Sequence, residues 1–532
     1  MFYPVGCLFT YQKGKVVIMI YFFGGCIFWG IWVFLIYVVR PNAVLSKETM
    51  ETAIRRTHKK RHIIDIIIVV MVVTVLLCIL PMSLSPWYNG TMPVHRDQYE
   101  VLAESILDGR LHLDDGDVDP RLLELENPYD VESRWEAGMT DFWVAWDHAF
   151  YNGHYYMYFG VVPVFLLFLP YRIITGTSLT TYHATQIFTA FFILGVFMLF
   201  FLLSKKFFRK MTVSVYLSLS AAVSIMSVWY IADAPALYCT PIAAGICMEI
   251  WSIFFFMKAV WDSNNERKST YMGVLGSLFG ALTFGCRPPI AVANILAVPM
   301  FVRYLKGKQF NLKLLKQILA VFIPYIVIGL LLMLYNYARF ENPFEFGQSY
   351  QLTVMDQRTL FADRLNMTTI IEDVWNSFIG SAPLSDSFPY ITFQSVLLNF
   401  PICLIAVFCL MYKGTRSALK ENKLVGLTCV LLFTPVLITV TQSIGAPGIG
   451  ERYRSDLYWV MGIILFILFG HFLEGMSDRH KRIWGLIISL LAFTTIFRSI
   501  LFWMVPNDWN FTYELSYPEY LTVFEKVFRL GF

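Results

Sequence analysis

Long apolar runs separated by short polar connections repeat along most of this chain of 532 residues. A helix needs about 20 mostly apolar residues to cross the hydrocarbon core of a bilayer. The runs that reach or approach this length are 16–39, 62–83, 184–204, 212–232, 237–260, 270–286, 289–305, 316–336, 394–412, 424–442, 457–474 and 483–505. The pattern predicts an all-α polytopic membrane protein with about 12 transmembrane helices.

One further apolar run, 158–174, is shorter and contains Pro163 and Pro170. The bias of Lys and Arg toward cytoplasmic loops decides how to interpret it. The connections rich in Lys and Arg are 40–61, 205–210, 303–316, 413–423 and 479–482. They all fall on one side of the membrane only if 158–174 does not cross it. We therefore expect a re-entrant or interfacial segment, or two half-passes, near 158–174, with both termini outside.

This sidedness leaves two long loops outside the membrane, 84–157 and 337–393, together with the C-terminal tail 506–532. The first loop is acidic, with 15 Asp and Glu residues against four Arg. Long loops of this kind are usually functional. The chain accordingly divides into an N-terminal span with its basic loop (1–61), a transmembrane domain (62–505) and the outer tail.

Composition excludes several other classes of protein. The chain is 57% hydrophobic and only 15% charged, whereas about 25% of an ordinary soluble chain is charged. The formal net charge of +4 gives no basic footprint for nucleic acid, so we expect no nucleic-acid partner. The sequence contains no GxxxxGK[ST] motif, which argues against an ATP-driven pump, and no histidine spacing typical of a metal site.

The first outer loop opens with a sequence typical of an amphipathic helix. The apolar positions at helical spacing are Tyr99, Leu102, Ala103, Ile106 and Leu107. Asp97 stands at the N-cap position and Gly109 supplies the stop. The Asp97 carboxylate has two compatible roles here: it caps the helix, and it is placed as a general base at the boundary between water and lipid.

A second cluster, 146–160, is rich in aromatic and histidine side chains, and Asn152-Gly153 predicts a tight turn within it. Aromatic residues at a membrane boundary often form an interfacial belt. The alternative is a stacking surface for a sugar ring or a wall for a lipid headgroup. In that interpretation Tyr155 lies against the substrate and His154 contacts a phosphate.

Isolated charges lie in three short turns on the outer side: Asp233, Arg287, and Arg452 with Arg454. Charged side chains at the membrane edge can simply reach into water. Arginine, however, suits bidentate phosphate binding, and the turn at Arg287 is too short for free solvation. We therefore expect an outward-facing phosphate pocket. Glu249, inside a predicted span, is either a functional acid or the partner of a polar group on a neighbouring helix.

The layout resembles the GT-C superfamily of integral-membrane glycosyltransferases, which includes the protein O-mannosyltransferases and the lipid A aminoarabinose transferase. In those enzymes an Arg-Asp-Glu-like motif opens the first outer loop and leads into a Tyr-x-x-x-Ala-type helix. The matching residues here are Arg96-Asp97-Gln98-Tyr99, Ala103 and Leu107. Gln98 departs from the family's second acidic residue. Segment 154–163 takes the place of the family's Lys-Pro-Pro-Leu segment but lacks its Lys.

The resemblance implies an activity. The donor is a sugar on a polyprenyl phosphate, and the acceptor is an envelope lipid, glycan or protein. Asp97 is the general base of an inverting transfer. The donor phosphate is bound by His154, by Arg287 or by the Arg452/Arg454 pair. The resemblance further implies multi-pass insertion among the lipids of a bacterial plasma membrane and no cofactor, with a divalent metal left open.

Two alternatives remain. The first is a transporter or flippase of a lipid-linked sugar, which requires polar residues at mid-bilayer on several helices. The second is a non-catalytic partner in an envelope-assembly complex, which would tolerate the loss of Asp97. The concentration of polar residues at one face of the predicted bundle favours the enzyme.

Overall fold

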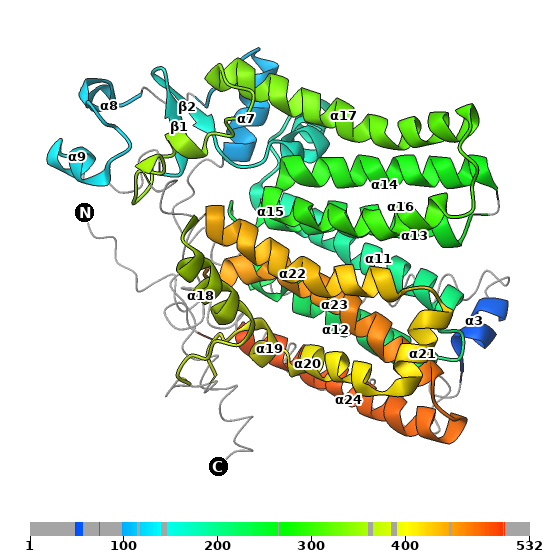
Figure 1. Ribbon diagram of the computed structural model, residues 1–532. Helices are drawn as coiled ribbons and strands as arrows, with labels where there is room; N and C mark the ends of the chain where they lie inside the picture. Colours follow the sequence, from blue (N-terminus) through cyan, green and yellow to red (C-terminus); the bar gives the residue numbers. More distant parts are fainter. Residues whose placement is uncertain are drawn as a thin grey trace.

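The computed structural model describes residues 48–56, 74, 98–113, 118–139, 146–233, 235, 237–263, 265–359, 365–384, 391–445, 449–503 and 505. Within this part the chain is mainly helical, and its one sheet is a two-stranded hairpin. The long helices lie side by side in one bundle, with short elements gathered at its two ends (Figure 1). Apart from the hairpin at Asn152-Gly153, the described chain is all-α, as predicted.

The long helices are α11 (Thr181–Phe207), α12 (Val213–Asp233), α13 (Thr240–Trp261), α14 (Glu266–Cys286), α17 (Leu312–Phe340), α22 (Val425–Gly445), α23 (Glu451–Glu474) and α24 (Asp478–Phe502). A further pass consists of α15 (Pro288–Ala291), the 3-10 turn η4 (Val292–Leu296) and α16 (Ala297–Leu305). Eight helical passes in the described residues, α14 not among them, are long and apolar enough to cross a membrane. The chain is therefore a membrane protein. The predicted span 16–39 and nearly all of 62–83 lie outside the described residues.

The predicted span 394–412 is not one straight helix. It consists of α19 (Val396–Asn399), α20 (Pro401–Phe408) and the 3-10 turn η8 (Cys409–Met411), after which α21 (Lys413–Glu421) turns away by 82°. The first break falls at Phe400 because a residue before proline avoids the helical region. With this bent pair counted as one span, the described residues hold up to nine candidates.

Contacts between connections define one end of the bundle, termed the basic end. They are Met50 N–H to Met211 O at 2.8 Å, Lys205 to Asp262 at 2.9 Å, Lys210 N–H to Glu474 at 2.9 Å, and Lys313 to Glu266 at 2.5 Å. The short helices α3 (Met50–Arg56) and α21 lie at this end (Figure 1). The described basic connections therefore meet at one end of the bundle, as the charge pattern predicts.

The opposite end, termed the loop end, carries further short elements (Figure 1). They are α7 (Gln98–Leu107), α8 (Pro120–Glu124), α9 (Val131–Glu136), β1 (His148–Tyr151), β2 (His154–Met157), η5 (Gln348–Tyr350) and α18 (Met367–Phe378). The hairpin turn has positive φ at Asn152 (48°) and Gly153 (78°), which confirms the predicted tight turn. The predicted amphipathic helix forms as α7. Its N-cap position, Asp97, lies outside the described residues.

The apolar segment after the hairpin also stays at the loop end. The π-turn η3 (Val164–Phe168) and α10 (Leu169–Thr175) form a short apolar helix over Val164–Thr175, below the length of a span. It packs against α7, where the Tyr99 ring stacks on Phe168 with 5.3 Å between centres. Ile173 and Ile174 remain 63% and 82% exposed, which suits contact with lipid. The segment therefore forms no helix of membrane length, and its place at the membrane interface stays a prediction.

Helix α23 forms the centre of the bundle, and its apolar stretch is wholly buried. Small residues let its neighbours approach: a Cβ atom at Gly462 would overlap Val223 of α12. By contrast, α17 exposes most of its apolar side chains, including Leu330 and Leu334, as expected of a helix that faces lipid.

Candidate functional site

Arg287 and Arg452 lie against the same aromatic ring at the loop end. The guanidinium carbon of Arg287 is 5.3 Å from the centre of the Tyr453 ring, and that of Arg452 is 5.1 Å from it. Arg452 also lies over the Tyr238 ring at 4.4 Å. Such contacts hold a guanidinium in place without neutralising its charge. These four residues are termed the arginine cluster.

The local sequence fixes the backbone of Arg287. The residue stands between the end of α14 and Pro288, the first residue of α15. A residue before proline is biased toward extended conformations, and Arg287 has φ −155° and ψ 102°. Its Nε–H donates to both carboxylate oxygens of Asp456 at 2.8 Å. Its Nη2 is buried and has no hydrogen-bond partner in the described part of the chain, so it can donate to a ligand.

Asp456 serves to orient Arg287. This fully buried side chain on α23 also accepts a hydrogen bond from Gln442 Nε2, on α22, at 2.6 Å. The ion pair and this hydrogen bond together join three separate passes of the bundle. Arg452 is held differently: its recorded contacts are the two rings and a hydrogen bond to Tyr453 Oη at 3.4 Å. Among the described residues no carboxylate forms an ion pair with Arg452.

Two glycines bring the segment after the hairpin close to the arginine cluster. A Cβ atom at Gly160 would overlap the carbonyl oxygen of Cys286, and one at Gly285 would overlap Val162. The backbone at 160–162 therefore runs directly against the end of α14. Burial raises the pKa of the nearby Tyr158 hydroxyl, and the positive charges of Arg452 and Arg287 partly offset this rise in pKa. Tyr158 thus lies within electrostatic range of both guanidinium groups.

Asp147, just before β1, adds a buried carboxylate on the other side of Tyr238. It accepts hydrogen bonds from Tyr238 Oη and from Gln351 Nε2, the latter at 2.6 Å. Burial raises its pKa, and the bond from Tyr238 and the charge of Arg452 partly oppose this. Its backbone has φ 56° and its carbonyl accepts from Gln98 Nε2 at 2.9 Å. Gln98 therefore ties α7 to this network.

The predicted Asp233 lies in the same region, whereas Arg454 does not join the cluster. Asp233 is buried at the end of α12, and it acts electrostatically on the Cys239 thiol, as Arg287 and Arg452 do. Arg454 instead donates to Gln394 O at 2.7 Å and pairs with Glu451 at 2.5 Å. Residues two apart on a helix do not share a face, so Arg452 and Arg454 point to different neighbours.

His154 and Tyr155 are incorporated into the hairpin. The His154 ring stacks on His112 with 4.3 Å between centres. Tyr155 is buried, and its carbonyl accepts from Leu113 N–H at 2.6 Å. These recorded contacts lie within the first outer loop and do not bring either residue to the arginine cluster.

Sequence reasoning missed five members of the network: Asp147, Tyr238, Gln351, Tyr453 and Asp456. Tyr453 and Asp456 stand within a few residues of the predicted arginines, and the four-residue spacing from Arg452 to Asp456 places both on one face of α23. This spacing was the signal in the sequence that could have identified Asp456 as a neighbour of Arg452. Nothing in the local sequence distinguishes Gln351, which joins Asp147 from a loop 204 positions away.

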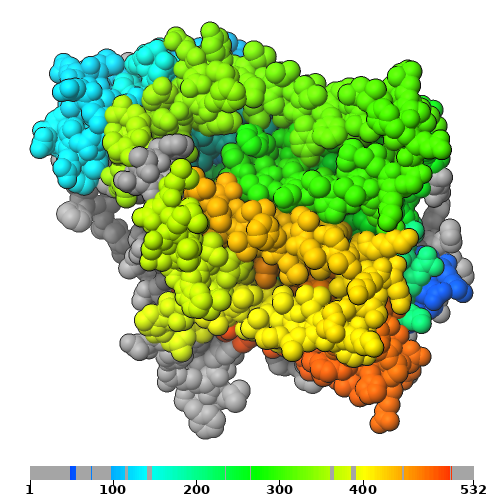
Figure 2. All heavy atoms as spheres, in the orientation of Figure 1, coloured from blue at the N-terminus to red at the C-terminus, as the bar shows by residue number. Residues whose placement is uncertain are grey.

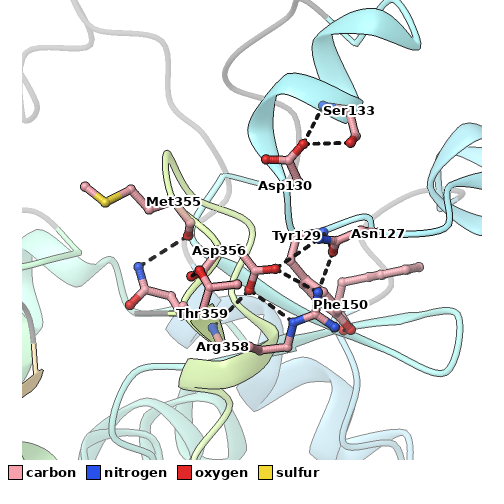
Figure 3. A network of polar contacts seen from close by, with 10 residues as sticks. Asn127, Tyr129, Asp130, Ser133, Phe150, Met355, Asp356, Arg358 and Thr359 are labelled. Carbon is pink, nitrogen blue, oxygen red and sulfur yellow. Dashed lines mark hydrogen bonds and ion pairs between the residues drawn. The ribbon is translucent and has the colours of Figure 1, made fainter. Parts of the chain in front are cut away.

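The two predicted outer loops are joined to each other at the loop end (Figure 3). Asn127 Nδ2 donates to Asp356 at 3.0 Å, and Arg358 donates to Asn127 Oδ1 at 2.5 Å. Arg358 also pairs with Asp356 at 2.8 Å and lies over the Tyr129 ring at 4.3 Å. The bond from Arg358 lowers the pKa of Asp356 to about 2. An open groove lined by Glu126, Ser133, Glu136 and Arg358 lies beside this joint.

Figure 2 shows the surface hollowed at the loop end, between the orange end of α22 and the green helices α14 and α17. In the described residues no three His, Cys, Asp or Glu side chains are arranged to hold a metal ion. No family model, no curated protein and no solved structure matches this chain.

Proposed function

We propose that this chain is a membrane glycosyltransferase that moves a sugar from a polyprenyl-phosphate donor to an envelope lipid, glycan or protein, with inversion. One observation carries the proposal. Arg452 forms no ion pair with a carboxylate among the described residues, and Arg287, against the same ring, has a buried N–H group without an acceptor in that part of the chain. An anion with several oxygens, such as a phosphate diester, satisfies both groups. About twelve spans and insertion in a bacterial plasma membrane belong to the same proposal.

The proposed chemistry assigns each part a role. The acceptor hydroxyl attacks the anomeric carbon, and its proton passes to the Asp97 carboxylate as the new glycosidic bond forms. The bond between the anomeric carbon and the phosphate oxygen breaks, and the negative charge that develops on the lipid phosphate is stabilised by Arg287 and Arg452. Tyr158, which has no hydrogen-bond partner recorded for its hydroxyl in the described residues, offers a third donor.

The test is binding of a long-chain polyprenyl phosphate and of the matching polyprenol to the purified protein, measured by native mass spectrometry. The phosphate should bind more tightly than the alcohol, and Arg452→Gln should weaken phosphate binding about tenfold or more. Arg303→Gln is the matched control, because that arginine also lies over an aromatic ring, Trp261, but at the basic end. Equal binding of both lipids, or unchanged binding by Arg452→Gln, would refute the proposal.

A second candidate is a transporter or flippase of a lipid-linked sugar. One observation favours it: the pass Pro288–Leu305 is interrupted by η4, and Asn294 of η4 contacts the intramembrane Glu249. Broken helices beside polar groups are typical of transporters. Reconstituted vesicles separate the two candidates. A transporter moves a fluorescent lipid-linked sugar across the bilayer without an acceptor, whereas the enzyme releases free polyprenyl phosphate only when an acceptor is present.

A further inference from the structure

Glu249 is a carboxylic acid buried in the middle of a membrane helix. It lies nine residues from the start of α13 and twelve from its end, and its side chain is 1% exposed. The charged side chains of the helices around it, α11, α12, α14, α16, α17 and α23, all lie in the turns near the helix ends. On α13 itself Lys258 stands near the basic end, over the Phe254 ring.

The partner of Glu249 is an amide from the broken pass. Asn294 of η4 donates through Nδ2 to Glu249 Oε2 at 3.4 Å, to Gly280 O at 3.0 Å and to Ala291 O at 2.9 Å. Asn294 Oδ1 in turn accepts from the hydroxyl of Tyr325 on α17. One amide therefore connects the acid on α13 with α14 and α17, and a 3-10 turn within a helix often marks a functional hinge.

Gly280 on α14 makes room for this polar cluster. A Cβ atom there would overlap Asn294 Oδ1, come within 2.5 Å of Tyr325 Oη and lie 2.9 Å from Ser252 Oγ. Three oxygen atoms from three different elements thus occupy the space that a side chain would need. Thr283, one turn further along α14, lies beside the Glu249 carboxyl, and its hydroxyl donates to Phe279 O at 3.0 Å.

No opposite charge faces Glu249 in the described part of the chain. The facing groups are Thr283 from α14, Asn294 from η4 and Tyr325 from α17, and only Tyr325 can titrate. An ionised carboxylate without a counter-charge is costly inside a membrane. A bound metal cation fits poorly, because the Asn294 amide turns its N–H group, and not its oxygen, toward the carboxyl.

We propose that Glu249 is a proton-binding site in the interior of the bundle. The bound proton keeps the carboxyl neutral. The neutral carboxyl completes the hydrogen-bonded cluster with Asn294 and Tyr325 and holds η4 against α13 and α14. Loss of the proton at alkaline pH would place an unpaired charge in the cluster and loosen η4. This inference does not depend on the proposed glycosyltransferase activity.

The test combines infrared difference spectroscopy with thermal melting of the full-length purified protein in lipid nanodiscs, from neutral to alkaline pH. Glu249→Gln imitates the protonated acid, and Glu249→Ala removes the group. The matched control is Glu266→Gln. Glu266 is an exposed carboxylate at the start of α14, where it pairs with Lys313 of α17.

Three results are expected. The carbonyl band of a protonated carboxylic acid at neutral pH should lose intensity in Glu249→Gln but not in Glu266→Gln. Glu249→Gln should keep the neutral-pH melting temperature, whereas Glu249→Ala should lower it. The alkaline fall in melting temperature should be smaller in Glu249→Gln than in the wild type. An unchanged infrared band in Glu249→Gln, or a loss of stability as large as that of Glu249→Ala, would overturn the proposal.

Discussion

The Nε atom of Arg287 lies 2.8 Å from both carboxylate oxygens of Asp456, although 169 positions separate the two residues in the sequence. The pair ties the turn after α14 to the second turn of α23. A carboxylate that orients an arginine leaves the remaining N–H groups of that arginine free to bind a ligand. Here one of those groups, Nη2, is buried and unpaired in the described part of the chain.

Breaking this pair from one side should destabilise the protein. Asp456→Ala leaves the guanidinium of Arg287 buried without its partner, and the expected loss is about 3–5 kcal/mol. The double variant Arg287→Met with Asp456→Leu removes both charges and should recover most of that loss, because apolar packing replaces a desolvated pair. Thermal melting in detergent compares the variants. A double variant as unstable as the single one would show that the charges themselves are needed.

Gly160 should be intolerant of a side chain. A methyl group there would overlap the backbone carbonyl oxygens of Cys286 and Gly285, which cannot move without shifting the end of α14. We expect Gly160→Ala to lower stability by about 1–3 kcal/mol and to weaken polyprenyl-phosphate binding by displacing Tyr158. Gly329→Ala is the control, since nothing lies within 4 Å of a Cβ atom at that position. If Gly160→Ala and Gly329→Ala changed stability and lipid binding equally, the close approach of Gly160 to the end of α14 would be contradicted.

Asp97→Asn separates the two roles assigned to Asp97. Asparagine caps helices about as well as aspartate, so expression and melting temperature should not change. If Asp97 is the general base, the rate of sugar transfer should fall about 10²–10⁴-fold, the usual contribution of such a group. The measurement is transfer of labelled sugar from the polyprenyl-phosphate donor. Unchanged transfer by Asp97→Asn would remove Asp97 from the mechanism and leave it as a helix cap.

The joint between the outer loops should open in acid. The folded-state pKa of Asp356, about 2, lies below its ordinary value of 3.8. The carboxylate therefore contributes full stability above pH 3.8, and this contribution is lost as the pH falls toward 2. Hydrogen exchange at residues 351–359 should rise over that range. Asp356→Asn should show fast exchange at neutral pH as well; a pH profile identical to the wild type would exclude this ion pair as the cause.

Cysteine labelling tests the orientation of the bundle. In a background with the nine native cysteines replaced, Glu132→Cys introduces an exposed thiol on α9 at the loop end. Ser417→Cys introduces one on α21 at the basic end. On intact cells a membrane-impermeant reagent should label the first, and should label the second only after lysis, because basic connections face the cytoplasm. The reverse pattern would invert the topology and remove the access to lipid-linked donors that the proposed function requires.

Much of this architecture could be predicted from local sequence. Apolar runs of membrane length become helices because an unpaired backbone group is too costly in lipid. Asn152-Gly153 forms the hairpin turn because these two residues tolerate positive φ. The distribution of Lys and Arg predicted that 158–174 does not cross the membrane, and the described basic connections do meet at one end. Arg287 stood out because prolines follow it in a short turn.

Other features were decided by tertiary structure. The neighbours of Arg452 and Arg454 differ because a helix turns 100° per residue, so the packing of α23 assigns Arg452 to the cluster and Arg454 to Glu451. His154 and Tyr155 pair within the hairpin rather than face the arginines. Asp147 belongs to the site only because Tyr238 and Gln351, both distant in the sequence, donate hydrogen bonds to its carboxylate. Local sequence sets which segments enter the membrane because burial there depends on each segment's own composition. The site depends on side chains more than a hundred positions apart, whose proximity only helix packing can determine.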